Sequence, residues 1–353
     1  MHRTNRSLRL LTVVLLLAAV WGTACSTKSG SHTAGPSLSP SIAPGSLPTT
    51  STATAAGLRS AIVPAGLAAP RSRTTGAAIG SDLYVMGGLD AAGAPSADVF
   101  KVPVSGAQLG KVTLAGHLST PTSRAAAVAY GSGILVFGGA GGAGSAPLDL
   151  VQLFDPATGA TTVAGHLPHP RTDLVALAVG NEMIVTAGWD GQALAPDILA
   201  TADGASFHNV GSLATPVRSP AATVVGTTVY LFGGVLSGAD YAGLFASAAQ
   251  SYNITTGLSK AVGTLPIPLA HGRAAVLGDQ VYVIGGWTPT GPSSAIQRFD
   301  VRTGAFTPSG RLPGPVAGPA TATIGTALYL AGGMGAQPLA DFEIVSAAAL
   351  SSR

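Results

Sequence analysis

The chain has 353 residues, of which 9% are charged, 48 are glycine and 25 are proline. This composition excludes an acidic disordered chain and favours an all-β fold with many tight turns. The pI of about 9.2 suggests a nucleic-acid partner, but three of the 18 basic residues lie within residues 1–24, which contain no acidic residue. The remaining 15 basic and 15 acidic residues cancel, so nucleic acid is not an expected partner.

Residues 1–24 have the features of an export signal. Three arginines precede an apolar run from Leu10 to Val20, which is too short to span a membrane comfortably. Small residues then precede Cys25, the only cysteine of the chain. The segment resembles a bacterial lipoprotein signal peptide, although Gly22 stands where an aliphatic residue is usual. The resemblance implies that Cys25 is lipidated and anchors an exported protein to the outer face of a bacterial membrane; ordinary secretion is the alternative.

Residues 25–57 are expected to form a disordered tether. They are almost entirely Ser, Thr, Pro, Gly and Ala, and four prolines recur at every fourth position: Pro36, Pro40, Pro44 and Pro48. Such a segment cannot bury enough apolar surface to fold. A flexible segment of this length spans roughly 30 Å, and residues 58–353 remain as the folded domain.

One pattern recurs six times in the folded domain. It consists of Leu, two residues, Pro, nine residues, Gly, six residues and a Gly-Gly doublet. The prolines are Pro70, Pro121, Pro170, Pro216, Pro268 and Pro315, and the doublets end at Gly88, Gly139, Gly188, Gly234, Gly286 and Gly333. Only Ala187 replaces a first glycine, and all length variation falls after the doublet. Loops are therefore expected after each doublet.

Each copy of the pattern predicts a β-hairpin. Small and branched residues lead to a Gly turn, and a continuous apolar strand such as Leu83 to Met86 follows. Apolar runs of this kind are typical of strands buried on both faces. A third strand ends in a Thr-Gly turn in several repeats, and a fourth strand returns to the next Leu. Four strands in about 50 residues predict one propeller blade.

The doublet after an aliphatic–aromatic strand, the Phe-Asp turn and the period near 50 resemble the kelch family over about residues 58–350. Kelch blades often carry a Trp on the fourth strand, which is absent here. The resemblance implies an all-β, six-bladed kelch-type β-propeller. The sixth repeat lacks a fourth strand after its third, Asp341 to Ser346. The stretch from Ser60 to Val63 is expected to complete that blade, so that an N-terminal strand closes the last blade and removes a free edge.

The third residue after each Pro begins the first strand of a blade, and in the kelch family this position often lines the binding pocket. In this chain these residues are Arg73, Arg124, Asp173, Ser219, His271 and Gly318. They are expected to form a polar mouth, or simply to face solvent. The loops after the doublets add Asp90, Trp189, Asp190, Tyr241 and Trp287 on the same face. The two arginines suit carboxylates, and the tryptophans suit a sugar or peptide, or pack between blades.

Catalysis is only weakly indicated. Galactose-oxidase-like kelch enzymes need copper and a Tyr–Cys cross-link, and the propeller has no Cys. Sialate-mutarotase-like kelch proteins use acid–base chemistry, for which Asp173 and His271 are weak candidates. No metal or other cofactor is expected. The favoured function is a surface-tethered recognition module for a protein, peptide or glycan, without enzymatic activity; the alternative is an extracytoplasmic carbohydrate-active enzyme of the mutarotase or lyase type.

Overall fold

The computed structural model describes residues 58–142, 146–237 and 244–347. The predicted signal peptide, the lipidation of Cys25 and the tether lie outside these ranges. The described residues form strands, turns and bends, and no helix long and apolar enough to cross a membrane occurs among them.

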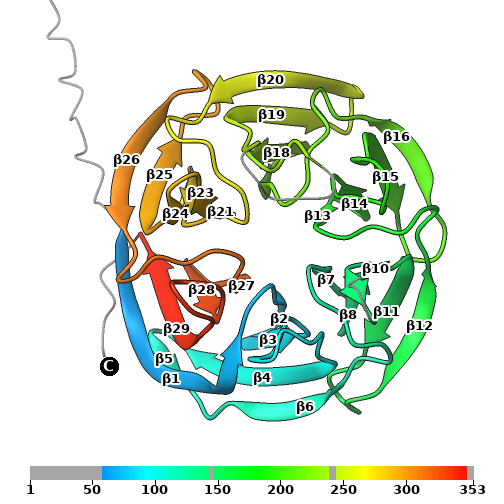
Figure 1. The fold of residues 1–353 in the computed structure, drawn as a ribbon, viewed down its shortest axis with the longest axis vertical. Helices are drawn as coiled ribbons and strands as arrows, with labels where there is room; N and C mark the ends of the chain where they lie inside the picture. The colour runs from blue at the N-terminus through cyan, green and yellow to red at the C-terminus, as the bar shows by residue number, and fades with distance from the viewer. Residues whose placement is uncertain (1–57, 143–145, 238–243, 348–353) are drawn as a thin grey trace, which may run out of the picture. The chain divides into compact units, whose positions relative to one another are not determined.

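Six antiparallel sheets are arranged around one axis (Figure 1), as the sequence predicts. From the axis outward, blade 1 contains β2 (Thr75–Ile79), β3 (Asp82–Met86), β4 (Asp98–Ser105) and β6 (Thr113–His117), with the short β5 (Gln108–Leu109) beside β4. Blade 2 contains β7 (Ala126–Tyr130), β8 (Gly133–Phe137), β11 (Leu150–Phe154) and β12 (Thr161–His166). Blade 3 contains β13 (Val175–Val179), β14 (Glu182–Thr186), β15 (Asp197–Thr201) and β16 (His208–Ser212).

Blade 4 contains β17 (Ala221–Val225), β18 (Thr228–Phe232), β19 (Ala248–Asn253) and β20 (Leu258–Thr264). Blade 5 contains β21 (Arg273–Leu277), β22 (Gln280–Ile284), β25 (Ala295–Phe299) and β26 (Phe306–Arg311). Two small hairpins, β9 (Ala140–Gly141) with β10 (Ala146–Pro147) and β23 (Trp287–Thr288) with β24 (Gly291–Pro292), decorate blades 2 and 5.

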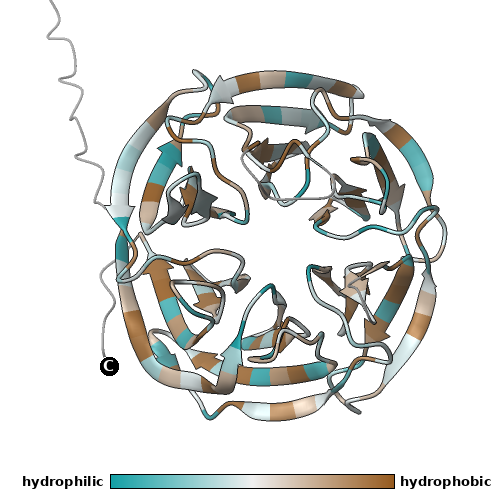
Figure 2. Cartoon of the chain, viewed as in Figure 1, coloured by the Kyte–Doolittle hydropathy of each residue, from teal (hydrophilic) through white to brown (hydrophobic). Residues whose placement is uncertain are grey.

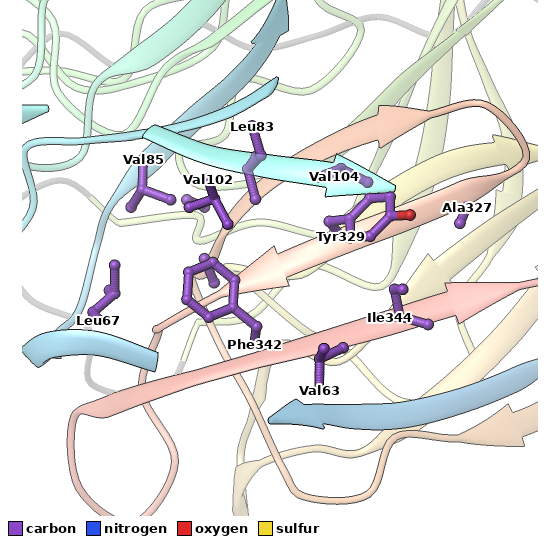
Figure 3. Packing of buried hydrophobic residues seen from close by; sticks show 12 residues of the cluster. Val63, Leu67, Leu83, Val85, Val102, Val104, Ala327, Tyr329, Phe342 and Ile344 are labelled. Carbon is purple, nitrogen blue, oxygen red and sulfur yellow. The ribbon is translucent and has the colours of Figure 1, made fainter. Parts of the chain in front are cut away.

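Blade 6 is built from both ends of the domain. Its order is β27 (Ala320–Ile324), β28 (Ala327–Ala331), β29 (Leu339–Ser346) and, outermost, β1 (Arg59–Arg71). Val63 and Leu67 of β1 are buried in a cluster with Phe342 and with Leu83 of blade 1 (Figure 3). The predicted closure by an N-terminal strand is therefore confirmed.

The hydrophobic core lies between the blades. Leu83 to Met86 on β3 are at most 2% exposed because both faces of this strand are covered. Alternate side chains enter different clusters: Leu83 and Val85 pack toward blade 6, whereas Tyr84 and Met86 pack toward Ile134 of blade 2. Figure 2 shows apolar residues along the strands of all six blades and a mixed pattern on the outermost strands. Each blade is thus stabilised by its two neighbours.

The Gly-Gly doublets join neighbouring blades. In every repeat the second doublet glycine donates its backbone N–H to the carbonyl of the residue that follows the next repeat's Pro, as in Gly139 to Arg171 at 2.8 Å. The first glycine has a positive φ, and a Cβ there would lie 2.1 Å from the Leu269 oxygen at Gly233 and 2.7 Å from the Arg71 oxygen at Gly332. Close backbone approach therefore explains the doublet. Ala187 is the exception and has a φ of 58°.

Candidate functional site

The six residues that follow each Pro by three positions lie together around the axis, and we call them the axial ring. They are Arg73, Arg124, Asp173, Ser219, His271 and Gly318. The backbone N–H of each residue after Arg73 donates to the carbonyl of the preceding member, at 2.8 to 3.0 Å. A Cβ built on Gly318 would be 3.9 Å from the backbone nitrogen of Arg73, so the sixth member of the ring lies next to the first. The spacing of the repeats therefore identified a real spatial group, while a role in binding stays a prediction.

All six ring residues adopt the left-handed backbone conformation. Their φ values lie between 54° and 59°. A residue with a side chain costs about 1 kcal/mol or more in this region, and such strain clusters at functional sites. Gly318 shows that glycine is compatible with this position, yet the other five members carry side chains. A side chain is therefore not excluded by the strained backbone at five of the six positions.

A small cup of about 50 Å³ lies against the axial ring and is also lined by Arg273 on β21. A larger channel of about 490 Å³ runs between the innermost strands of the blades. Arg273, Ala125, Leu174 and Pro220 line both spaces, so the cup adjoins the channel. A water molecule occupies about 30 Å³ of liquid, so the cup has room for a group the size of a carboxylate.

The cup carries a net positive charge. Its described lining contains the guanidiniums of Arg73, Arg124 and Arg273 and the single carboxylate of Asp173. Burial lowers the pKa of Arg273 to about 10, which leaves it charged at neutral pH. Burial and then the charge of Arg73 lower the pKa of His271 to about 3, so this imidazole is neutral. The cup therefore has two excess positive charges and suits an anion.

Asp173 and Trp189 are linked through Arg218. The Arg218 guanidinium lies 3.8 Å from the Asp173 carboxylate, and both side chains are 2% exposed. The same guanidinium lies 5.6 Å from the centre of the Trp189 ring. Trp189 thus packs against the loop that leads into the next blade, which favours the packing role over a ligand platform.

The other predicted face residues that the structure describes lie outside the cup. Trp189 and Trp287 are half-buried, and neither is among the described residues that line it. Asp90 and Asp190 accept hydrogen bonds from backbone amides of their own loops, which gives them a structural role. Tyr241 lies outside the described residues.

Arg273 is the charged residue of the described cup lining that the sequence did not predict. Its guanidinium donates to the carbonyls of Pro319 at 2.8 Å, Gly272 at 3.2 Å and Thr74 at 3.4 Å, and so reaches from blade 5 to blade 1. A signal was present, because the other repeats have Thr, Ala or Val at this place: Thr75, Ala126, Val175, Ala221 and Ala320. The arginines beside the ring differ in role. Arg71 and Arg171 form ion pairs with Asp98 and Asp197 at the start of the third strands.

Six radial sheets, closed by an N-terminal strand and carrying a polar ring at the axis, define the chain as a β-propeller. The family described as Kelch motif matches residues 268–313, which contain all four strands of blade 5. With six copies of the pattern in one register, the chain is a kelch-repeat β-propeller.

The fold is shared with many solved structures, of which 873 chains match. One is described as "Structure of YjhT": it is 17% identical, its TM-score is 0.68, and the match covers 79% of this chain and 95% of that one. At this identity the likeness shows the fold alone. A comparison with curated proteins gave no match.

Proposed function

We propose that the protein is a recognition module whose axial ring binds the carboxylate of a protein, peptide or glycan ligand. The observation that carries this proposal is the ring itself, in which five strained side-chain-bearing residues surround a cup with net positive charge. Guanidiniums held together repel one another and are costly to desolvate. A bound carboxylate offsets both costs through charge-assisted hydrogen bonds.

Ser219 supports the same proposal. The residue is 7% exposed, and its hydroxyl oxygen has no hydrogen-bond partner among the described residues. A buried hydroxyl without a partner costs about 1 to 3 kcal/mol. A ligand oxygen in the cup would satisfy this group, and the neutral imidazole of His271 offers a further polar atom beside it.

Replacing Arg73 and Arg124 by glycine should weaken binding of acidic ligands at least 100-fold and leave the domain equally or more stable, by up to about 2 kcal/mol. The gain arises because glycine adopts a positive φ without strain, as at Gly318. The measurements are titration against acidic peptides and glycans, and denaturant unfolding of the same variant. Lys111→Ala with Arg302→Ala removes the same charge at exposed positions and serves as the control. A stability loss above about 1 kcal/mol, or unchanged binding, would refute the proposal.

An acid–base enzyme of the mutarotase or lyase type is the second candidate. It is favoured because Asp173 and His271 belong to the same ring. Ser219 lies between them, since its N–H donates to the Asp173 carbonyl and its carbonyl accepts from the His271 N–H. The pKa of about 3 at His271 weighs against it, because an effective general base has a pKa near the working pH. Saturable turnover of a sugar acid that disappears in Asp173→Asn and His271→Gln would establish this candidate instead.

We also propose that the propeller is exported and held at the outer face of a bacterial membrane by a lipid on Cys25. The support is the sequence of residues 1–25 alone. A single acyl chain binds membranes only marginally, so firm anchoring needs the several chains that a lipoprotein cysteine carries. Cys25→Ser should move the protein from the membrane fraction to the soluble exported fraction, as followed by fractionation and immunoblotting. Export without any change in membrane association would favour plain secretion or another anchor.

A further inference from the structure

The central channel differs from the cup in its chemistry. Its described lining is made mainly of Ala, Val, Leu and Gly, with a few Thr residues, and Arg273 is the one charged member. No aromatic, carboxylate or amide side chain is among these described residues. Sites that recognise a small polar molecule position a few polar side chains around it. Apart from its threonines and Arg273, the described lining of this channel has no polar side chain.

Besides Arg273 and the threonines, the polar groups of the described channel lining are those of the backbone. The six innermost strands β2, β7, β13, β17, β21 and β27 are each the last strand of their sheet on the axial side. An edge strand presents a row of unpaired N–H and C=O groups. These strands have five residues each, which corresponds to a length of about 16 Å. An extended peptide is the ligand whose own backbone repeats at the same spacing.

We propose that the ligand is the C-terminal segment of an extended peptide. Its terminal carboxylate occupies the cup between Arg73, Arg124 and Arg273, and its backbone pairs with the edge of an innermost strand inside the channel. This inference rests on the proposed carboxylate binding at the ring. It is supported by the adjacency of the two spaces, whose linings share Arg273 and Ala125. It is also supported by the difference in charge, because the cup is cationic and Arg273 is the one charged residue in the described lining of the channel. A channel of about 490 Å³ selects small side chains such as Ala, Ser and Val.

The test is a calorimetric titration of the full chain with N-acetylated peptides of one to six alanine and valine residues, each as free acid and as amide. The affinity of the free acids should rise with length up to about five residues, the length of the strands, and then level off. Amidation should weaken binding at least about 30-fold, since it removes charged hydrogen bonds to the guanidiniums. Alternate N–H groups of an extended peptide point to opposite edges. N-methylation of the groups that face the paired strand should abolish binding, whereas N-methylation of the groups on the opposite edge should be tolerated.

Two variants localise the peptide. Ala178 and Thr323 are exposed residues that line the channel, so Ala178→Phe and Thr323→Phe should remove the length dependence while acetate still binds. Ala157→Phe, at an exposed turn residue outside the described lining of the channel, should change nothing.

The outcomes separate the inference from the proposed function. Equal binding of acetate and of every peptide length, or tighter binding of a hydroxylated acid such as gluconate than of any peptide, would overturn the peptide inference and leave carboxylate binding in place. Binding of amides as tight as that of free acids would overturn both. Absence of binding by any carboxylate would also overturn both.

Discussion

A chain that begins at residue 67 should be far less stable than one that begins at residue 58. The removed segment contains six of the seven β1 residues that pair with β29, from Arg59↔Ser346 to Gly66↔Asp341. It also contains Val63, which is buried beside Phe342 and Ile344 (Figure 3). At about 1 kcal/mol for each lost hydrogen bond and about 2 kcal/mol for the valine, the loss should reach about 5 kcal/mol or more. That is a large part of the total stability of an ordinary domain.

Denaturant unfolding followed by tryptophan fluorescence measures this effect. The control is the chain that begins at residue 58, which should match a chain that begins at residue 25, because the composition of residues 26–57 offers no core. Val63→Ala is a milder companion and should cost about 1 to 2 kcal/mol. Equal midpoints for the chains that begin at 58 and at 67 would mean that β29 tolerates a bare edge and that the closure contributes nothing.

Glu343 should make the propeller less stable as the pH rises from about 4.5 to about 7. It lies on β29 opposite Leu330, the place that Gln152 and Gln250 take in blades 2 and 4. Gln250 both accepts from the Thr215 N–H, at 3.0 Å, and donates to the Thr215 carbonyl, at 2.8 Å. A carboxylate can accept but cannot donate, and Oε2 of Glu343 is buried without a hydrogen-bond partner among the described residues.

The pKa shift at Glu343 gives the sign of this effect. Burial, with a smaller contribution from Asp341, raises its pKa from 4.5 to about 7. Between these values the unfolded chain releases the proton while the folded chain keeps it, so stability is complete below pH 4.5 and falls until pH 7. With partial screening of the charge, the loss should be about 2 kcal/mol.

Glu343→Gln should remove this pH dependence and stabilise the domain by about 2 kcal/mol at pH 8, with almost no effect at pH 4. Gln250→Glu is the matched reverse change and should introduce the same loss in blade 4. Thermal unfolding of the three proteins across pH 4 to 9 is the measurement. A wild-type curve that is flat over this range, or a Glu343→Gln variant that is weaker at pH 8, would show that Glu343 finds a partner as a carboxylate.

Much of the architecture could be predicted from the sequence because it depends on local and periodic signals. A Cβ at the first doublet position would clash with a carbonyl oxygen at the start of the next blade, which favours glycine there. The number of doublets in the sequence therefore predicted the number of blades. The missing fourth strand and the stretch near Val63 likewise indicated the closure. Identical offsets inside the repeats placed Arg73, Arg124, Asp173 and His271 at one structural position, which is why the axial ring was predicted correctly as a group.

The chemistry of the ring depended on contacts between blades, which no local pattern contains. Only the tertiary structure brings Arg273 from blade 5 to the Thr74 carbonyl of blade 1 and so into the cup. Only burial beside Arg73 lowers the pKa of His271 to about 3. Only the tertiary structure packs Trp189 against Arg218, which in turn lies 3.8 Å from Asp173. Repeat spacing determines where a residue sits in its own blade. Its charge state and partners are decided by residues up to 199 positions away, because the propeller brings six separate segments around one axis.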